Sequence, residues 1–437
     1  MKNRARIMIG CCCFLLLLVS WVVVISSKSP AEKQLELMRQ AAGLTEDYIY
    51  ILAVPLLEEA VGYRTRNTPL AENELKRVYL ELIDNTGYIG KYTSLLEKQM
   101  NQKDAPIDVF AEAANYYMSV SKLPDALKAL TAGIAKTGDP GLVAQYENSR
   151  YAYETNRTSY DYVAAIFGHT VQVRTDGKWG IAKADGTPLI PCEYERISTF
   201  SADRAIVKKN GEIYAVDSNN NRVAKLHEEA LDFGNYADNR ISFLIDGKWR
   251  RATGDFTLGA NAFERIGTYS GGYAAAMADG KWGVIDLATK WLIPAEYDGV
   301  AQDELGRCYA QGAVFVRQGG AVYLLSGGKQ AGAAYEDARP FSDEGFAAVK
   351  RGGKWGFIDT AGTEKVGFEY DDALSFGQHL AAVRIGGLWG YISMSGQVVI
   401  EPIFIEAKSF SDGTAPVLTE QGWQFIKLLE YKKKVGL

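Results

Sequence analysis

The chain has 437 residues, enough for two or three domains, and its 47% hydrophobic and 23% charged content is ordinary for globular proteins. Its 48 basic and 53 acidic side chains give a formal net charge of −5, a balance that argues against nucleic acid as a partner. The sequence contains no phosphate loop, dinucleotide-binding glycine set, zinc motif or serine-nucleophile motif. We therefore expect no cofactor, no metal and no enzymatic activity.

Residues 7–26 form an apolar run that follows three basic residues, Lys2, Arg4 and Arg6. A helix of this length, rising about 1.5 Å per residue, crosses a ~30 Å hydrocarbon core. Because basic flanks stay in the cytoplasm, we predict a cytoplasmic tip at 1–6, a single-pass signal anchor at 7–26 and an extracytoplasmic remainder. A cleaved signal peptide is the alternative, although the run is long for one and no Ala-x-Ala site follows it.

Residues 31–158 are rich in helix-forming residues, with apolar residues at helical spacing and Pro or Gly at regular breaks. They predict an all-α region of helical hairpins near 31–43, 46–62, 71–85, 88–102, 107–121, 124–137 and 140–154. The stretch from Ala113 to Pro140 resembles one tetratricopeptide unit, with Ala113, Ala114 and Tyr117 on a first helix and Ala126 on a second. An unspecialised helical bundle remains the alternative.

Residues 165–437 contain eight copies of one unit, each marked by a turn of the form Gly-Lys-Trp-Gly or a variant of it. Six units keep the tryptophan, and two carry Ile213 or Val322 instead. The intervals between these marker positions are 34, 36, 33, 40, 33, 34 and 34 residues, a regularity typical of repeat arrays. An aromatic residue recurs fifteen positions after several of the tryptophans. The marker residues are Trp179, Trp249, Trp282, Trp355, Trp389 and Trp423, with Tyr194, Tyr297 and Tyr370.

Each unit predicts three short strands separated by Gly- and Asp-containing turns. An alternating run precedes the tryptophan turn, a second run follows it, and a third often contains Ile-Pro-x-Glu-Tyr, as in residues 190–194 and 293–297. Eight three-stranded units can close into a propeller-like ring or stack as an open β-solenoid. We favour the closed ring because closure protects strand edges.

The units resemble WG repeats, the tryptophan-glycine repeat family found widely in bacterial proteins. The resemblance implies a β-rich array that presents an interaction surface, and together with the apolar run at 7–26 it predicts a protein of the bacterial cell membrane. Three places depart from the pattern: the second unit, the fifth unit, and Arg250, which replaces the turn glycine. We expect these units to be capping, distorted or specialised.

The marker residues are predicted to pack one unit against the next, since an array needs such a position in every unit. Carbohydrate stacking on the tryptophans is the alternative. The lysines before them, such as Lys281 and Lys354, are expected to lie over the rings or in solvent. Carboxylates near the repeat tyrosines would form a line, which we interpret as a solvated face or, less simply, a surface for a cation or basic peptide.

These features predict a membrane-anchored extracytoplasmic scaffold that presents the WG-repeat surface to a protein, peptide or cell-wall polymer. The alternatives are a structural spacer and a cell-wall hydrolase that uses carboxylates of the repeat face. A binding array should carry large side chains that the repeat itself does not require, and Trp291, Arg250, Arg251 and Tyr309 are the candidates.

Overall fold

The computed structural model describes residues 28–85 and 87–429, which divide into two compact units, residues 1–146 and 147–437. Within the described ranges, no helix is both long and apolar enough to cross a membrane. The predicted tip at 1–6 and anchor at 7–26 lie outside the described residues.

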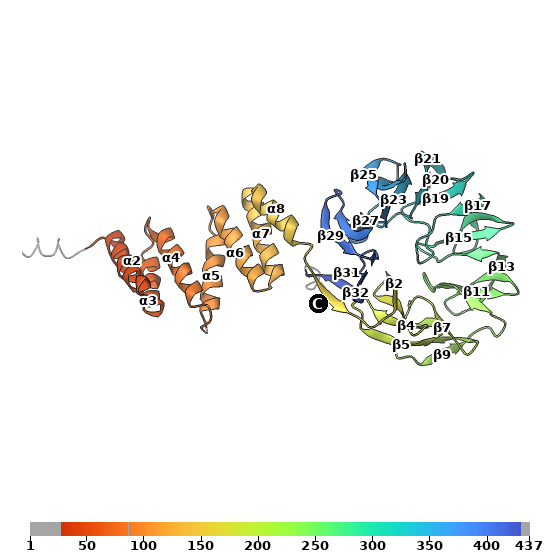
Figure 1. The fold of residues 1–437 in the computed structure, drawn as a ribbon, viewed down its shortest axis with the longest axis horizontal. Coiled ribbons are helices and arrows are strands. Elements are labelled where there is room, and N and C mark those ends of the chain that lie inside the picture. Colours follow the sequence, from red (N-terminus) through yellow and green to blue (C-terminus); the bar gives the residue numbers. More distant parts are fainter. Residues whose placement is uncertain (1–27, 86, 430–437) are drawn as a thin grey trace, which may run out of the picture. The chain divides into compact units, whose positions relative to one another are not determined.

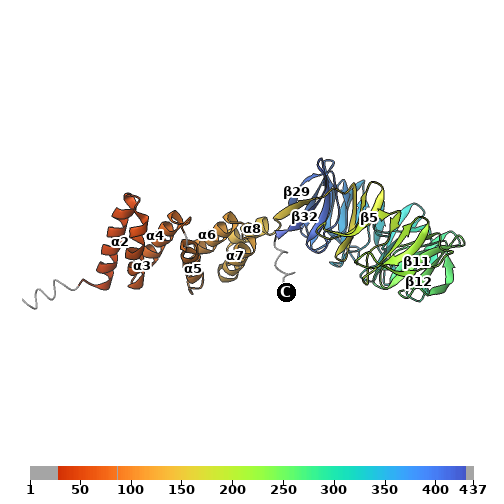
Figure 2. The ribbon, with the colours of Figure 1, turned by 90° about the horizontal axis from the view of Figure 1, so that it is seen from below.

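The first unit consists of seven described helices joined by short connections, as the sequence predicts, and successive helices lie side by side in both ribbon views (Figures 1 and 2). Ser29 begins the first helix with a capping box, in which its backbone N–H donates to Glu32 at 2.7 Å. The helices are α2 (Pro30–Glu46), α3 (Tyr50–Gly62), α4 (Thr68–Glu81), α5 (Tyr88–Met100), α6 (Ile107–Ser119), α7 (Leu123–Thr137) and α8 (Pro140–Ser149).

The helices bury the apolar faces that their spacing predicts. Ala113, Ala114 and Tyr117 of α6 are buried, as is Ala126 of α7. A side chain at Gly133 of α7 would overlap Phe110, with a Cβ only 2.7 Å from its ring, so these two helices pack closely because that residue is glycine.

The second unit is a closed ring of eight four-stranded antiparallel sheets, or blades, and the strands are named here in blade order. Blade 1 has β2 (Tyr162–Phe167), β3 (Thr170–Thr175), β4 (Lys178–Lys183) and β5 (Pro188–Tyr194). Blade 2 has β6 (Arg196–Ile197), β7 (Ala205–Lys209), β8 (Glu212–Val216) and β9 (Arg222–Lys225). Blade 3 has β10 (Asp232–Phe233), β11 (Arg240–Ile245), β12 (Lys248–Thr253) and β13 (Leu258–Phe263). Blade 4 has β14 (Arg265–Ile266), β15 (Tyr273–Ala278), β16 (Lys281–Asp286) and β17 (Trp291–Tyr297).

The second half of the ring repeats this arrangement. Blade 5 has β18 (Gly299–Val300), β19 (Ala313–Gln318), β20 (Ala321–Ser326) and β21 (Lys329–Tyr335). Blade 6 has β22 (Asp337–Ala338), β23 (Phe346–Arg351), β24 (Lys354–Asp359) and β25 (Glu364–Tyr370). Blade 7 has β26 (Asp372–Ala373), β27 (Leu380–Ile385), β28 (Leu388–Ser393) and β29 (Val398–Phe404). Blade 8 has β30 (Glu406–Ala407), β31 (Thr414–Thr419), β32 (Gly422–Leu428) and β1 (Tyr153–Arg157).

The prediction of three strands per unit is wrong, because most blades begin with an additional strand of only two residues, such as β22 or β26. Two residues are too few to show the alternation of polar and apolar side chains from which a strand is predicted. The last strand of each of blades 1 to 7 lies on the outside of the ring, which places the two-residue strands towards the centre (Figure 1).

Strand β1 closes the ring by supplying the fourth strand of blade 8. Its residues pair antiparallel with β32, from Tyr153 opposite Leu428 to Arg157 opposite Gln424. The closed propeller is therefore confirmed and the open solenoid is wrong. The helical range predicted to reach residue 158 is too long at its C-terminal end, since residues 153–157 belong to the β unit.

The Trp-Gly step has a structural cause in the pairing of the third and fourth strands of a blade. In blade 7, Trp389 lies opposite Phe404 and Tyr391 opposite Ile400, so Gly390 faces a bulge of three residues on β29. A Cβ at Gly390 would lie 2.5 Å from the carbonyl oxygen of Ile400. Glycine leaves room for this bulge in blades 1, 4, 6 and 7, where the bulge accounts for the recurring fifteen-residue interval, whereas blade 5 has a bulge of the same size opposite Tyr323.

The exception at Arg250 follows the same geometry. In blade 3, Trp249 pairs with Phe263, one residue earlier than the recurring interval, Arg250 then pairs with Ala262, and the bulge begins one position later. Because the bulged strand no longer crosses over this position, a side chain fits there. Arg250 thus marks a shifted bulge and leaves the blade intact.

We expect Gly390→Ala to lower the free energy of unfolding by about 1–3 kcal/mol, the usual cost of forcing an extra carbon into a packed site. The matched control is Arg250→Ala at the same repeat position, which should change it by no more than about 0.5 kcal/mol. Urea unfolding of both variants measures the difference, and equal losses would refute the steric role of the Trp-Gly step.

Candidate functional site

The marker residues lie within the blades, and of the nine only Trp389 borders the central cavity described below. Trp355, Trp389, Trp423, Tyr194 and Tyr370 are buried, and Trp179, Trp249, Trp282 and Tyr297 are partly buried. Three of the tryptophans belong to apolar clusters that also contain residues of the following blade, as Trp355 does with Ala381 of blade 7. This placement agrees with the predicted packing role.

The carboxylates that follow the repeat aromatic residues connect adjacent blades. Asp298 accepts from Lys281 of blade 4 at 2.7 Å and from the backbone N–H of Gly319 of blade 5 at 2.9 Å. Asp371 makes the same pair of contacts, with Lys354 at 2.6 Å and with Gly386 at 3.0 Å. The lysine hydrogen bond holds the pKa of each carboxyl below its usual value, and the backbone N–H lowers it further.

Lys281 and Lys354 are exposed, as one of the two predicted placements has it, and each forms an ion pair with the neighbouring aspartate, a contact that the sequence did not predict. The predicted line of carboxylates is largely occupied by such contacts. Within the described part of the chain, no group of three or more histidine, cysteine or acidic side chains is arranged to hold a metal ion.

The fifth unit contains an inserted loop, residues 302–308, which accounts for the interval of 40 residues in the repeat. Asp303 stabilises the loop by accepting the backbone N–H groups of Leu305 and Arg307 at 3.0 and 2.9 Å, and the Arg307 side chain at 2.7 Å. Neighbouring blades also bind the loop. The Asn235 amide donates to the Leu305 carbonyl at 3.0 Å, and the backbone N–H of Thr268 donates to the Gly306 carbonyl at 2.9 Å.

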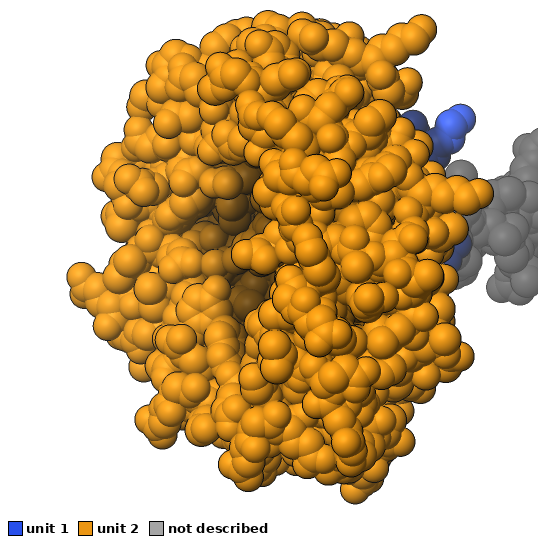
Figure 3. Space-filling model, turned by 90° about the vertical axis from the view of Figure 1, so that its right-hand side faces the viewer, with its two compact units in different colours: residues 1–146 blue, residues 147–437 orange. Residues whose placement is uncertain are grey.

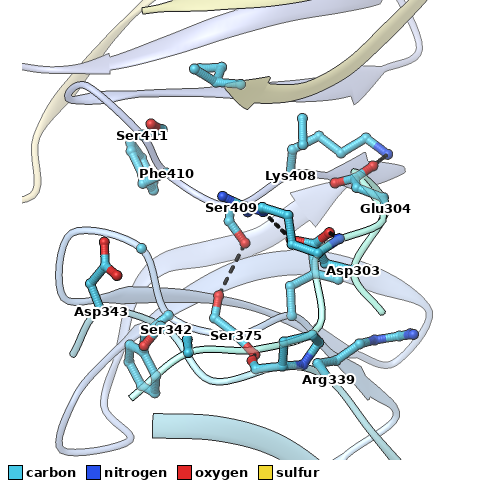
Figure 4. Close-up of a pocket in the computed structure, with 18 of the residues that line it drawn as sticks. Asp303, Glu304, Arg339, Ser342, Asp343, Ser375, Lys408, Ser409, Phe410 and Ser411 are labelled. Atoms are coloured by element: carbon cyan, nitrogen blue, oxygen red, sulfur yellow. Dashed lines mark hydrogen bonds and ion pairs between the residues drawn. The ribbon is translucent and has the colours of Figure 1, made fainter. Parts of the chain in front are cut away.

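On the opposite side of the ring, the loop is attached to blade 8 through Lys408. The ammonium group of Lys408 lies 2.7 Å from an oxygen of Glu304 in the loop and 2.7 Å from an oxygen of Glu406 (Figure 4). It also lies 5.8 Å from the ring centroids of Tyr162 and Trp423. We call Glu304, Lys408 and Glu406 the carboxylate clamp.

The clamp perturbs both kinds of charge. Burial alone would lower the pKa of Lys408, but Glu304 and Glu406 outweigh it and hold this pKa above its usual value. Burial raises the pKa of Glu304, and the attraction of Lys408 offsets only part of this rise. The ion pair therefore holds Lys408 charged at neutral pH.

A cavity of about 690 Å³ lies between the inserted loop and the segments that follow the inner strands of blades 6, 7 and 8. A face of this unit is visibly hollowed in the space-filling view (Figure 3). Serine hydroxyls tie the cavity wall together, since Ser375 donates to the Pro340 carbonyl at 2.6 Å and Ser409 donates to the Ser375 carbonyl at 3.1 Å (Figure 4). The volume falls within the range of ~300–1,000 Å³ usual for ligand pockets.

Sequence reasoning did not single out the carboxylate clamp or the cavity. The long interval in the fifth unit was the available signal, and Tyr309, one of the four large unshared side chains, does line the cavity. The other three are elsewhere. Trp291 packs edge-on against Phe263 and is 39% exposed, Arg250 donates to the Ala260 carbonyl, and Arg251 lies against Gly259.

The WG-containing repeat model matches this chain over residues 179–212, 262–282, 282–320, 333–355, 355–389 and 389–423. The closed ring of blades is thus a β-propeller, and the chain is a WG-repeat protein. The matched residues all lie in the propeller, so the tetratricopeptide resemblance of the helices stays a prediction. None of the curated proteins matches the sequence.

Several solved structures are similar to the chain at low sequence identity. Hsv2p of Kluyveromyces lactis is 10% identical, with a TM-score of 0.37, over 53% of this chain and 92% of that one. YCF48 bound to a D1 peptide is 12% identical, with a TM-score of 0.33, over 61% and 99% of the two chains. The Neurospora crassa Pan2 WD40 domain is 12% identical, with a TM-score of 0.29, over 53% and 88%.

Removal of the clamp cation should destabilise the propeller. Lys408→Met leaves Glu304 and Glu406 facing each other, and a broken buried pair costs about 3–5 kcal/mol. Since the two glutamates are 33% and 41% exposed, we expect a loss of about 1–3 kcal/mol at pH 7. The loss should shrink as the pH falls towards 5, because burial raises the pKa of Glu304 in the folded protein, and protonation of this carboxyl removes its repulsion with Glu406.

Urea unfolding of Lys408→Met at both pH values measures this effect, with the exposed Lys329→Met as the control. A loss that does not depend on pH would show that the clamp contributes packing alone.

Proposed function

We propose that the protein is a scaffold whose WG-repeat propeller binds a protein or peptide at the central cavity. The inserted loop is the observation that supports this proposal most strongly. The remaining blades are similar in length and contacts, whereas this loop departs from the repeat, is held by contacts with blades 3, 4 and 8, and walls off a cavity beside blades 6 to 8. A pure spacer would have no need of such a loop.

Two features favour binding over a hydrolase. The carboxylates nearest the centre, Glu304 and Glu406, are engaged by Lys408, and Asp303 is engaged by Arg307. Those next to the repeat aromatics, such as Asp298 and Asp371, are engaged in links between blades. Asp343 and Glu344 line the cavity without a cationic partner among the described residues, but they follow each other on one turn, and Glu344 accepts the backbone N–H of His379 at 3.0 Å. A general acid and base pair would need two carboxyls that are both free to exchange protons with a substrate.

The scaffold is proposed to be anchored in a bacterial cell membrane through residues 7–26, with the helical unit and the propeller outside the cytoplasm. This part of the proposal rests on the apolar run and its basic flank in the sequence. Protein, peptide and cell-wall polymer are the ligands compatible with this location, and the hydrogen-bonding, acidic lining of the cavity favours a peptide.

The binding site is tested by photo-cross-linking in cells. A photoreactive amino acid replaces Asp343, which lines the cavity, or Asp203, which occupies the corresponding turn of blade 2 away from it. We expect a discrete cross-linked protein or peptide from position 343 and none from position 203. Identical patterns, or no product from either position, would count against the cavity as the binding site.

The location is tested with fusions at the C-terminus. A periplasmic-type reporter such as alkaline phosphatase placed after Leu437 should be active, while a fluorescent protein that folds only in the cytoplasm should be dark. The same fusion with residues 7–26 deleted serves as the control and should reverse both signals. A bright cytoplasmic reporter on the full chain would refute the predicted topology.

A further inference from the structure

We propose that the cavity selects a peptide segment that carries lysine or arginine, an inference that rests on the proposed binding function. The cavity is lined by seven carboxylates but only three cationic side chains. Each of the three cations is already paired with a lining carboxylate: Arg307 with Asp303 at 2.7 Å, Arg339 with Asp372 at 3.5 Å, and Lys408 with the two glutamates of the clamp. The lining therefore presents a surplus of negative charge to any occupant.

The surplus is concentrated on one turn of blade 6. Asp343 and Glu344 have no cationic partner among the described residues, although both line the cavity. Glu344 accepts the backbone N–H of His379 at 3.0 Å, which fixes its side chain in place. Asp343 is exposed and its carboxylate makes no such bond, so it is free to pair with a ligand. Acidic groups in a partly enclosed cavity attract cations more strongly than the same groups on an open surface.

The adjacent residue supplies a feature that suits a peptide backbone. Ser342 lines the cavity on the same turn as Asp343 (Figure 4), and its buried hydroxyl has no hydrogen-bond partner. A buried hydroxyl without a partner is unfavourable, and rotation about its Cα–Cβ bond would let it donate to a carbonyl oxygen in the cavity. The turn thus combines a donor suited to a peptide carbonyl with carboxylates suited to a basic side chain.

The position of the loop explains why the site is open on one side only. In blades 3 and 4, Asn235 and Thr268 follow the inner strands and hydrogen-bond to the inserted loop, so that side of the centre is occupied by the protein itself. The acidic turn of blade 6 lies where the loop leaves the cavity open. The insertion and the acidic turn therefore define one site.

The test uses the full-length protein in an uncharged detergent and two fluorescent peptides. One peptide carries three lysine or arginine residues in a Gly-Ser frame, and the other carries glutamine at the same positions. Fluorescence anisotropy at low ionic strength should show at least tenfold tighter binding of the basic peptide. The preference should weaken as salt is raised, because screening reduces the attraction.

Variants locate the effect. The double variant Asp343→Asn with Glu344→Gln keeps the size and hydrogen-bonding capacity of both side chains, and it should weaken basic-peptide binding at least fivefold. Asp203→Asn, in the corresponding turn of blade 2, should leave binding unchanged. Equal unfolding midpoints for the variants and the parent confirm that folding is not the cause.

Each other outcome refutes the inference. Equal affinity for the basic and glutamine peptides, or no binding of either, would show that the cavity does not select a peptide by its positive charge. Cross-linking from position 343 would then still stand, so the proposed binding function is judged separately. Equal losses in the double variant and in Asp203→Asn would place the effect outside the cavity. Competition by spermidine at the affinity of the peptide would identify a small polyamine as the occupant instead.

Discussion

The glycine after the repeat tryptophan of blades 1, 4, 6 and 7 is the constraint on which half of the propeller depends. Each of these blades pairs its third strand with a fourth that carries extra residues, and the excess has to pass over one backbone position without a side chain. Bulges of this kind increase the local twist of a strand pair. Because the same bulge recurs at the same repeat position in blades 1, 4, 6 and 7, these blades share one shape, and units of one shape can be arranged around a single axis.

Two sets of contacts then hold neighbouring blades in place. Apolar clusters run from each blade into the next, and they contain most of the buried aromatic residues of the ring. Near the surface, carboxylates such as Asp298 join a lysine of one blade to a backbone amide of the following one. The inserted loop breaks this repetition at the centre of the ring, where polar contacts with blades 3, 4 and 8 and the buried side chains of Leu305 and Cys308 hold it in place.

Sequence periodicity predicted the parts of this structure that repeat. The seven described helices, the eight units and the aromatic partner fifteen residues after the tryptophan all follow from regular spacing. The two-residue inner strands were not predicted because they are too short to show the alternation of a strand. Strand β1 was not predicted because Tyr153–Arg157 lies next to the helices in sequence, and its partner is at the other end of the unit. The carboxylate clamp was not predicted for a related reason. Glu304 and Lys408 meet only because the ring brings blades 5 and 8 to a common centre.

Closure by β1 also fixes the order in which the propeller can be completed. Thr158, just after β1, hydrogen-bonds to the carbonyl of Trp423, 265 residues later in the sequence. The first strand of the unit to leave the ribosome can therefore pair only after the last strand has been synthesised. The entropy of closing so long a loop grows only slowly with its length, but contacts of such high sequence separation slow folding. Until β32 arrives, β1 and β31 present unpaired edges that invite pairing with other chains. A nascent or truncated chain of this protein is therefore exposed to misassembly for most of its synthesis, and the cell must shield it or complete it quickly.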